Sequence, residues 1–198
     1  MKKKGVILLV VLLLLAVPVF AQNSGNRNIW NGLHTGMTEE QALTRAREIV
    51  GNFSFTFSRH NATGISEGFV KIDELGYTFS QGLTKIVVFS DNPVYGFRAP
   101  GGLIFNNAIE FKLYNGNLVA VGVYWRASNE TRNQMLRQQF GRPKYDDNLY
   151  PAWEVSGLFV ATVTTGNSFQ VLFVDISSFR NAVRDDTRRK QQSSGIQF

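Results

Sequence analysis

The strongest constraint on the fold is a change of hydrophobic spacing, from a helical period to a period of two, that occurs twice along the chain. Thr38 has the properties of a helix N-cap, and the apolar residues between it and Gly51 form one stripe at helical spacing. Immediately afterwards Phe53, Phe55 and Phe57 alternate with small polar residues, as in a half-buried strand. The first cycle is therefore predicted to be a helix followed by strands.

The strands that follow indicate an antiparallel meander. Residues 109–114 alternate, Asn115-Gly116-Asn117 supplies turn residues that tolerate positive φ, and residues 118–125 return as a strand. A new helix is expected from residue 128 or 129 to Phe140, which begins the second cycle. Three further strands are expected over residues 152–155, 158–164 and 169–176.

The two cycles predict one α+β domain, residues 29–179, in two halves that each contain a helix and an antiparallel meander. The halves are residues 29–126 and 127–179, and no residue-level repeat relates them, so an internal duplication stays open. We expect both helices to pack on one face of a mostly antiparallel sheet, or of two adjoining sheets. Residues 22–28 indicate a polar linker, and residues 180–198 a flexible basic tail.

The first 21 residues have the three parts of a cleavable signal peptide. Three lysines open the segment, residues 6–17 form an almost purely aliphatic run, and a Val-Phe-Ala ending predicts cleavage after Ala21. The run is shorter than the roughly 20 residues that a helix needs to span a bilayer. Without cysteine the chain has no site for a bacterial lipid anchor. We therefore expect a periplasmic or secreted protein, with a retained N-terminal anchor as the alternative.

The charge of the chain depends strongly on its first residues. Removal of the three signal lysines lowers the formal net charge from +6 to +3. The remaining excess is concentrated late, in Arg180, Arg184 and residues 188–190, where a solvated terminus is the simpler interpretation. We expect no nucleic-acid partner and no stable membrane span after cleavage.

Residues that carry chemistry are few, and the sequence contains no recognisable catalytic or metal-binding set. His34 and His60, the two histidines, have neither metal-ligand spacing nor a neighbouring glutamate. The carboxylate pairs Asp73-Glu74 and Asp146-Asp147 lie beside expected turns, where solvated carboxylates are common. A hydrolase or lyase whose carboxylate site is assembled in three dimensions, with His60 near Ser58, remains an alternative. No cofactor is expected.

Aromatic residues make up 13% of the chain, and several lie where a binding role is a reasonable hypothesis. Tyr95, Phe97 and Arg98 lie on a connection rich in glycine and proline, and their types are enriched in interface hot spots. They can equally fold back over the open end of the sheet. Trp125 and Trp153 close strands of the two halves, either as core anchors or as the lining of a groove. Most other aromatic rings are expected in the core, among them Phe53, Phe55, Phe111 and Phe173.

The segment Gly36-Met37-Thr38-Glu39-Glu40-Gln41 resembles the opening of the helix in outer-membrane-assembly lipoproteins of the SmpA/BamE type. The helix ending of that family is echoed by Phe140-Gly141-Arg142-Pro143, followed by Trp153. Those proteins resemble the repeats of β-lactamase-inhibitor protein in fold, and they act as noncatalytic interaction modules in the bacterial envelope. The resemblance implies a helical layer on an antiparallel sheet, and binding in preference to catalysis.

Two functions follow as expectations. The first is an exported, noncatalytic binding or interaction protein of the bacterial envelope, with a protein, peptide or glycan as its partner. The second is the carboxylate-based hydrolase or lyase. They differ in one observable respect, because an enzyme requires the carboxylates or His60 to converge in a pocket, whereas a binding protein requires an open surface.

Overall fold

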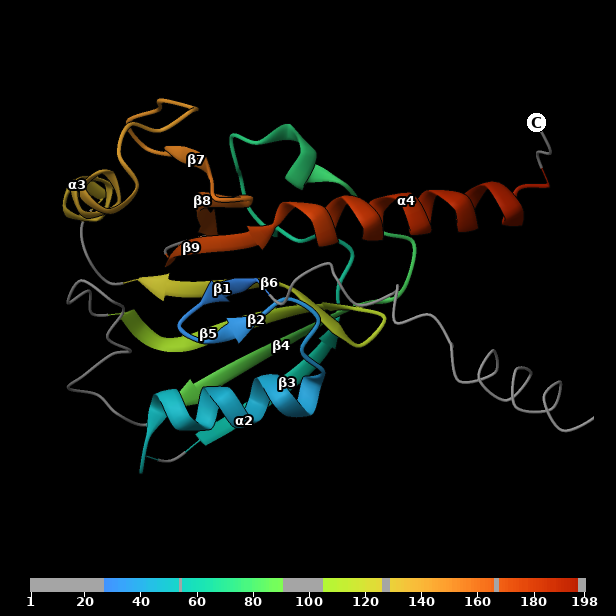
Figure 1. Cartoon of the computed structure of the whole chain (residues 1–198), viewed down its shortest axis with the longest axis horizontal. Helices are drawn as coiled ribbons and strands as arrows, with labels where there is room; N and C mark the ends of the chain where they lie inside the picture. Colours follow the sequence, from blue (N-terminus) through green and yellow to red (C-terminus); the bar gives the residue numbers. More distant parts are fainter. Residues whose placement is uncertain (1–26, 54, 91–104, 126–128, 166–167, 196–198) are drawn as a thin grey trace, which may run out of the picture.

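The computed structural model describes residues 27–53, 55–90, 105–125, 129–165 and 168–195 (Figure 1). Side chains are not described at a few positions inside these ranges: 105–107, 125, 129, 164, 165, 168 and 169. The predicted signal peptide and almost all of the predicted linker lie outside the described residues, so both stay predictions. Among the described residues, no helix is both long enough and apolar enough to cross a bilayer.

A seven-stranded antiparallel sheet forms the centre of the fold, with the strands in the order β3-β4-β5-β6-β9-β8-β7. Its strands are β3 Phe55–Asn61, β4 Leu83–Ser90, β5 Phe105–Tyr114, β6 Asn117–Trp125, β7 Ala152–Val155, β8 Leu158–Thr165 and β9 Ser168–Asp175. A separate two-stranded sheet is made by β1, Asn28–Trp30, and β2, Leu33–His34.

The described helices are α2, Glu39–Val50, α3, Asn129–Phe140, and α4, Ile176–Ser193, with a short 3₁₀ helix η2 over Asp73–Gly76. The predicted α+β class is confirmed. Each half contains a helix followed by a meander, and the two meanders are joined into one sheet because β6 pairs with β9.

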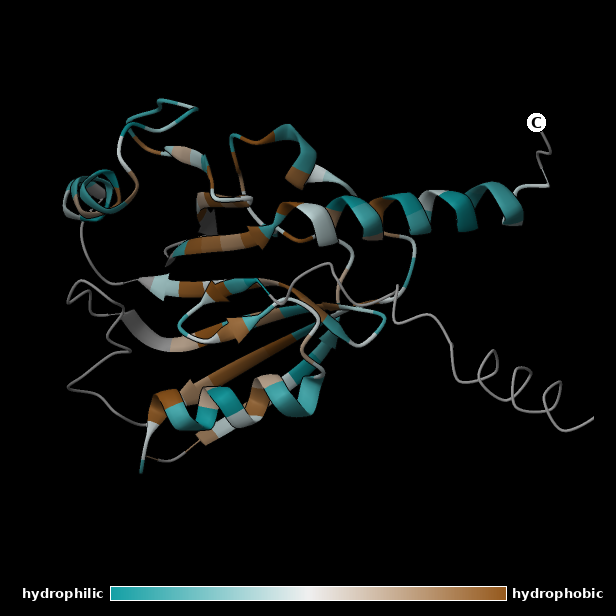
Figure 2. Cartoon of the chain, viewed as in Figure 1, coloured by the Kyte–Doolittle hydropathy of each residue, from teal (hydrophilic) through white to brown (hydrophobic). Residues whose placement is uncertain are grey.

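The alternation of side chains along the strands gives the sheet two buried faces. Central strands such as β4 and β9 are accordingly largely hydrophobic (Figure 2). The first face carries residues such as Ile109, Phe111 and Val123, and it is covered by α2, α3 and the β1–β2 sheet. The second face carries residues such as Leu172 and Val174, and it is covered by α4 and the segment 62–80. The two predicted helices therefore contribute to the same core, and a third, unpredicted helix covers the opposite face.

The prediction of a flexible tail over residues 180–198 is wrong as far as Ser193, because these residues continue α4. Phe179 and Ala182 are buried against the second face, and Asp175 caps the helix by accepting a hydrogen bond from the Ser178 backbone N–H at 2.8 Å. Basic residues alternate with this apolar stripe along the helix. The basic composition of this part of the sequence therefore reflects the solvated side of α4 and not the side that packs against the sheet.

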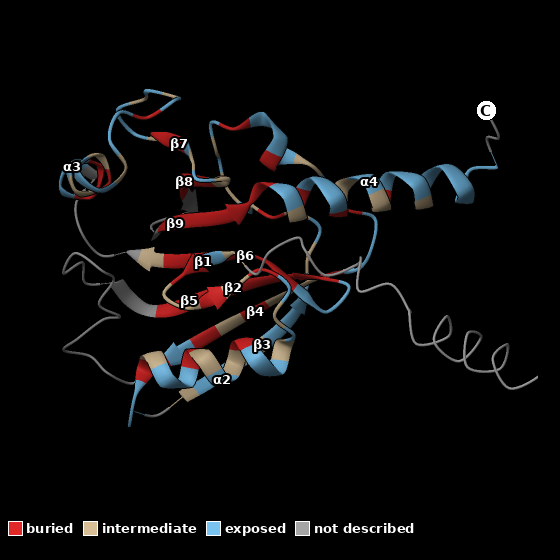
Figure 3. Ribbon diagram, in the orientation of Figure 1, coloured by how far each residue is buried: buried red, intermediate tan, exposed pale blue. Residues whose placement is uncertain are grey.

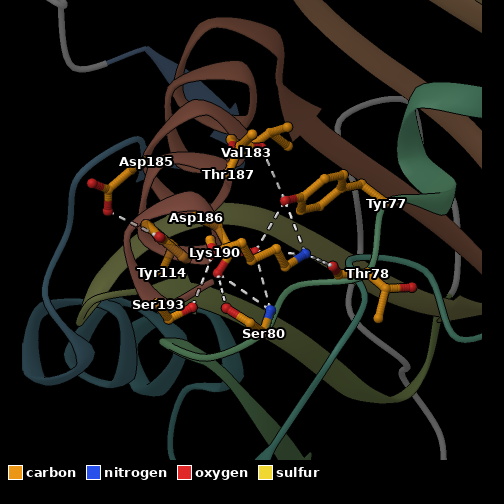
Figure 4. Close-up of polar contacts among 10 residues, drawn as sticks. All are labelled: Tyr77, Thr78, Ser80, Tyr114, Val183, Asp185, Asp186, Thr187, Lys190 and Ser193. Atoms are coloured by element: carbon orange, nitrogen blue, oxygen red, sulfur yellow. Dashed lines mark hydrogen bonds and ion pairs between the residues drawn. The ribbon is translucent and has the colours of Figure 1, made fainter. Parts of the chain in front are cut away.

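Asp186 fixes the middle of α4, and its side chain is fully buried (Figure 4). Its carboxylate accepts hydrogen bonds from the Tyr77 hydroxyl at 3.0 Å and from the Ser80 backbone N–H and hydroxyl at 3.0 and 2.5 Å. Lys190 lies 3.0 Å away on the next turn of the helix. Burial raises the pKa of Asp186, but these hydrogen bonds outweigh it and lower the pKa to about 2. The helix is thus attached to a segment about a hundred positions earlier in the chain.

The start of α2 is a capping box, as the sequence predicts. The Thr38 hydroxyl accepts a hydrogen bond from the Gln41 backbone N–H at 3.3 Å, and the Gln41 side chain accepts one from the Thr38 backbone N–H at 2.9 Å. The segment before it is attached to β6, because the Gly36 N–H donates to the Leu118 carbonyl and the Leu118 N–H to the Met37 carbonyl. The capping box therefore sets where α2 begins, and the two hydrogen bonds with Leu118 set its position beside β6.

Replacing Thr38 by alanine should lower the free energy of unfolding by about 1 kcal/mol, because the Gln41 backbone N–H in the first turn loses its partner, the Thr38 hydroxyl. Urea unfolding followed by circular dichroism measures the change. Thr44→Ala, an exposed site in the middle of α2, is the matched control and should not destabilise the protein. Equal stability of Thr38→Ala and the wild type would show that the capping box contributes nothing.

Candidate functional site

The aromatic residues predicted to bind a ligand fall into three groups in the structure. Tyr95, Phe97 and Arg98 lie outside the described residues, so their role stays a prediction. The backbone of Trp125 ends β6, and its side chain is not described. Trp153 is only 1% exposed, and its indole N–H donates to the Gly141 carbonyl at 2.9 Å. It is a core anchor beneath the end of α3, which is the first of the two roles that the sequence allows.

The carboxylates considered for an enzyme do not converge on a common pocket. Glu74 receives two hydrogen bonds from Arg180, at 2.8 and 2.9 Å, and Asp146 pairs with Arg137 at 2.6 Å. Asp147 accepts two backbone N–H groups of its own turn and also pairs with Lys71, at 3.2 Å. Within the described part of the chain, no group of three His, Asp or Glu side chains is placed to hold a metal ion.

The electrostatics of these carboxylates also differ from those of a general acid. The hydrogen bond from Arg180 lowers the pKa of Glu74, and that from Arg137 lowers the pKa of Asp146. The backbone N–H groups of Leu149 and Tyr150 lower the pKa of Asp147. A general acid at neutral pH needs a raised pKa, so these groups are suited to ion pairs on the surface.

His60 and Ser58 do lie together, with the imidazole Nε2 3.0 Å from the serine hydroxyl. Both project from the same side of β3, where a spacing of two residues brings side chains together. His60 is exposed, and within the described residues no carboxylate orients its ring. The contact is that of two neighbours on an exposed strand and lacks the third group of a catalytic triad.

The segment 62–80, here called the strap, crosses the second face of the sheet, from the end of β3 toward the loop before β7 (Figure 1). It contains η2 but is otherwise irregular. Phe69 packs edge-on against Tyr150, with ring centroids 4.7 Å apart, and Lys71 pairs with Asp147. Glu67, near the start of the strap, forms ion pairs with the sheet, and Tyr77 and Ser80, near its end, bind Asp186. Contacts of carboxylates thus hold the strap along much of its length.

Beneath the strap lies a buried polar cluster that the sequence analysis did not find. Lys112 is fully buried, and its Nζ lies 3.1 Å from a carboxylate oxygen of Glu110 and 3.1 Å from one of Glu67. Glu67 also pairs with Lys85 at 2.6 Å, and the Tyr124 hydroxyl donates to Glu110 at 3.0 Å. Glu110 and Lys112 are buried, whereas Glu67 and Lys85 reach the surface. The opposite charges of Glu110 and Lys112 balance, which makes their burial tolerable.

Two groups of the cluster have pKa values that differ from their ordinary ones. Burial, together with the charge of Glu110, raises the pKa of the Tyr124 hydroxyl, so it remains a hydrogen-bond donor at neutral pH. Burial also raises the pKa of Glu67, but the hydrogen bond from Lys85 and the charge and hydrogen bond of Lys112 outweigh it, so the net pKa is lowered. The ion pairs of Glu67 with Lys85 and Lys112 attach the strap to the sheet.

Gln170 borders this cluster on β9, and its side chain is in an unusual position. The residue is 3% exposed, and its Nε2 has no hydrogen-bond partner among the described residues. The amide lies directly over Gly122 of β6, where any Cβ would collide with it. A Cβ at position 122 would therefore require the Gln170 side chain to move, and it is this close approach, not the backbone conformation, that favours glycine there.

One edge of the seven-stranded sheet is formed by β3, and the other by β7. Within the described residues, β3 pairs with β4 alone, and most of its side chains are exposed (Figure 3). Phe57 is 49% exposed and Phe55 is half-buried. The prediction that Phe53 belongs to the core is wrong, since it is 50% exposed, whereas Phe111 and Phe173 are buried as expected.

A groove of about 510 Å³ runs between β3 and α2, beside this edge. Its apolar part is formed by Leu43, Phe55 and Phe57. Arg47 lies over the Phe55 ring at 4.8 Å, and Glu39 forms a 3.5 Å ion pair with Arg59. The groove is thus apolar along its floor and carries charges of both signs at its rim, which is the usual composition of a recognition surface.

A second groove, of about 660 Å³, lies on the other side of α2. It shares Glu40 and Thr44 with the first groove, so these exposed residues form a ridge between the two. Residues of the segment 36–41, which carries the family resemblance, line one groove or both. The sequence predicts α2 but not the grooves, because nothing in the sequence shows that β3 is an edge strand.

The comparisons with known proteins add no relative to this description. No protein-family model, no curated protein and no solved structure matches the chain.

Proposed function

We propose that the chain is an exported, noncatalytic binding protein of the bacterial envelope, and that its ligand is an extended segment of a partner protein that pairs with β3. The observation that carries the proposal is the open edge of β3 beside the groove that it forms with α2. A strand that adds to a sheet edge gains main-chain hydrogen bonds, and its alternate side chains enter neighbouring pockets. The open edge of β3 supplies the main-chain groups, and the groove beside it supplies a pocket for side chains.

The chemistry of the groove supports a polypeptide over a glycan. An unpaired strand edge presents N–H and C=O groups at a fixed spacing, which another extended chain matches. The floor formed by Leu43, Phe55 and Phe57 favours an apolar side chain on the incoming strand. Glu39 and Arg47 at the rim favour polar neighbours on either side of that residue. No contact among the described residues favours the hydrolase or lyase alternative.

Photo-cross-linking of the exported, full-length chain tests the proposal. A benzophenone amino acid at position 57 should form an adduct with a protein of different sequence in the envelope, and the cross-linked peptide should come from an extended segment. The same substitution at Leu149, which is 52% exposed and remote from β3 along the sheet, is the matched control and should form no such adduct.

Two results would contradict the proposal. One is the absence of any adduct from position 57, and the other is an equal yield from positions 57 and 149. N-terminal sequencing of the same material tests export, since the mature protein should begin at Gln22.

A further inference from the structure

We propose that β3 also pairs with β3 of a second copy of the chain, antiparallel and around a two-fold axis beside Ser58. The inference rests on the proposed function because it uses the same open edge of β3. The second copy and the partner segment compete for that edge. A two-fold axis normal to the sheet joins two such sheets edge to edge and leaves both α2 helices on the same face.

Two of the devices that usually prevent such pairing, a proline and a β-bulge, are not found in β3. Its seven residues contain no proline, and its register with β4 runs without a bulge from Phe55 to Asn61. Phe57 exposes about half of its ring surface at this edge. A straight, aromatic edge strand of this length is a template for another strand.

Side-chain parity restricts how two copies can pair. Residues opposite each other in an antiparallel pair lie on the same face, so odd positions of β3 must face odd positions. A register centred on Ser58 pairs all seven residues of each strand. It places Phe57 opposite Arg59 of the second copy and Thr56 opposite His60 of the second copy.

The charges of β3 favour this register over its neighbours. In the register centred on Ser58, the Arg59 guanidinium of each copy lies opposite the Phe57 ring of the other copy, so the dimer contains this contact twice. No like charges face each other in this register. A register centred on Arg59 places two guanidinium groups opposite each other, and one centred on Phe57 pairs only about five residues of each strand. Arg59 is free to turn, because its side chain is 61% exposed and its ion pair with Glu39 is long, at 3.5 Å.

Cysteine substitution tests the register directly, because the chain has no cysteine of its own. Ser58→Cys places two thiols opposite each other across the axis, within reach of a disulfide. The matched control Thr56→Cys places its two thiols four positions out of register, about 13 Å apart, which is too far. Mild oxidation of the full-length mature protein should therefore give covalent dimer from Ser58→Cys, at least tenfold more than from Thr56→Cys.

Charge substitutions at position 57 give a second measurement that needs no disulfide. Light scattering should show a dimer mass for the wild type and for Phe57→Glu, whose carboxylate faces Arg59 of the second copy. Phe57→Arg, which faces the same guanidinium, should be monomeric.

A monomer mass for the wild type at all concentrations, or equal covalent dimer from the two cysteine variants, would overturn the inference. A monomeric wild type that still cross-links from position 57 to another envelope protein overturns the dimer alone, whereas loss of both results overturns the proposed function as well.

Discussion

Lys112→Met should lower the free energy of unfolding by about 3 to 5 kcal/mol, as expected when one partner of a buried ion pair is removed. Glu110 is only 3% exposed, so its carboxylate would remain buried with the Tyr124 hydroxyl as its one described partner. Glu67 would also lose one of its two ion pairs with the sheet, and this contact helps to hold the strap. Urea unfolding monitored by tryptophan fluorescence measures the loss.

The double variant Lys112→Met with Glu110→Gln is the matched control. It removes the unpaired charge and keeps an oxygen that accepts the hydrogen bond from Tyr124, so it should recover much of the lost stability. A loss below about 1 kcal/mol for Lys112→Met, the size typical of exposed ion pairs, would contradict the burial of the cluster.

Asp186→Ala should lower the free energy of unfolding by about 2 to 3 kcal/mol at neutral pH. The pKa of this carboxyl group falls from an ordinary value of 3.8 to about 2 in the folded chain. A lowered pKa means that the carboxylate stabilises the fold fully above about pH 4. This contribution is lost as the pH falls from about 4 to about 2, where the carboxylate takes up its proton.

The stability difference between the wild type and Asp186→Ala should therefore shrink across that pH interval. Thermal unfolding at several pH values between 2 and 7 measures it. Glu74→Ala removes an exposed ion pair with Arg180 and is the control, with a much smaller expected loss. A difference between Asp186→Ala and the wild type that stays constant down to pH 2 would show that the ionised form of Asp186 is not what holds α4.

Elements defined by local signals were predictable from the sequence. Asn115 and Gly116 do adopt positive φ, at 49° and 81°, so the hairpin turns where their residue types indicate. The start of α2 is another such case, because Thr38 and Gln41 are close in sequence and satisfy each other. In both cases the stabilising contacts lie within a few residues, which is the range that sequence patterns report.

Features that depend on distant contacts were not predictable. The alternation of Glu110 and Lys112 with apolar neighbours places them on one side of a strand, but it does not show that the strap covers that side. Asp186 resembles a solvated helix residue, and its burial depends on Tyr77 and Ser80, more than a hundred positions earlier. Whether a strand is central or at an edge is decided by the order of the whole sheet.

The contact between Gly122 and Gln170 has a consequence for how this sequence can vary during evolution. Any side chain at position 122 meets the Gln170 amide, so a substitution there requires the Gln170 side chain to move or a shorter residue to replace it. The reverse change carries no such condition, because a shorter residue at position 170 leaves Gly122 acceptable. In homologous chains the two positions should therefore covary in one direction, with glutamine at 170 found more often where 122 is glycine than where 122 carries a side chain.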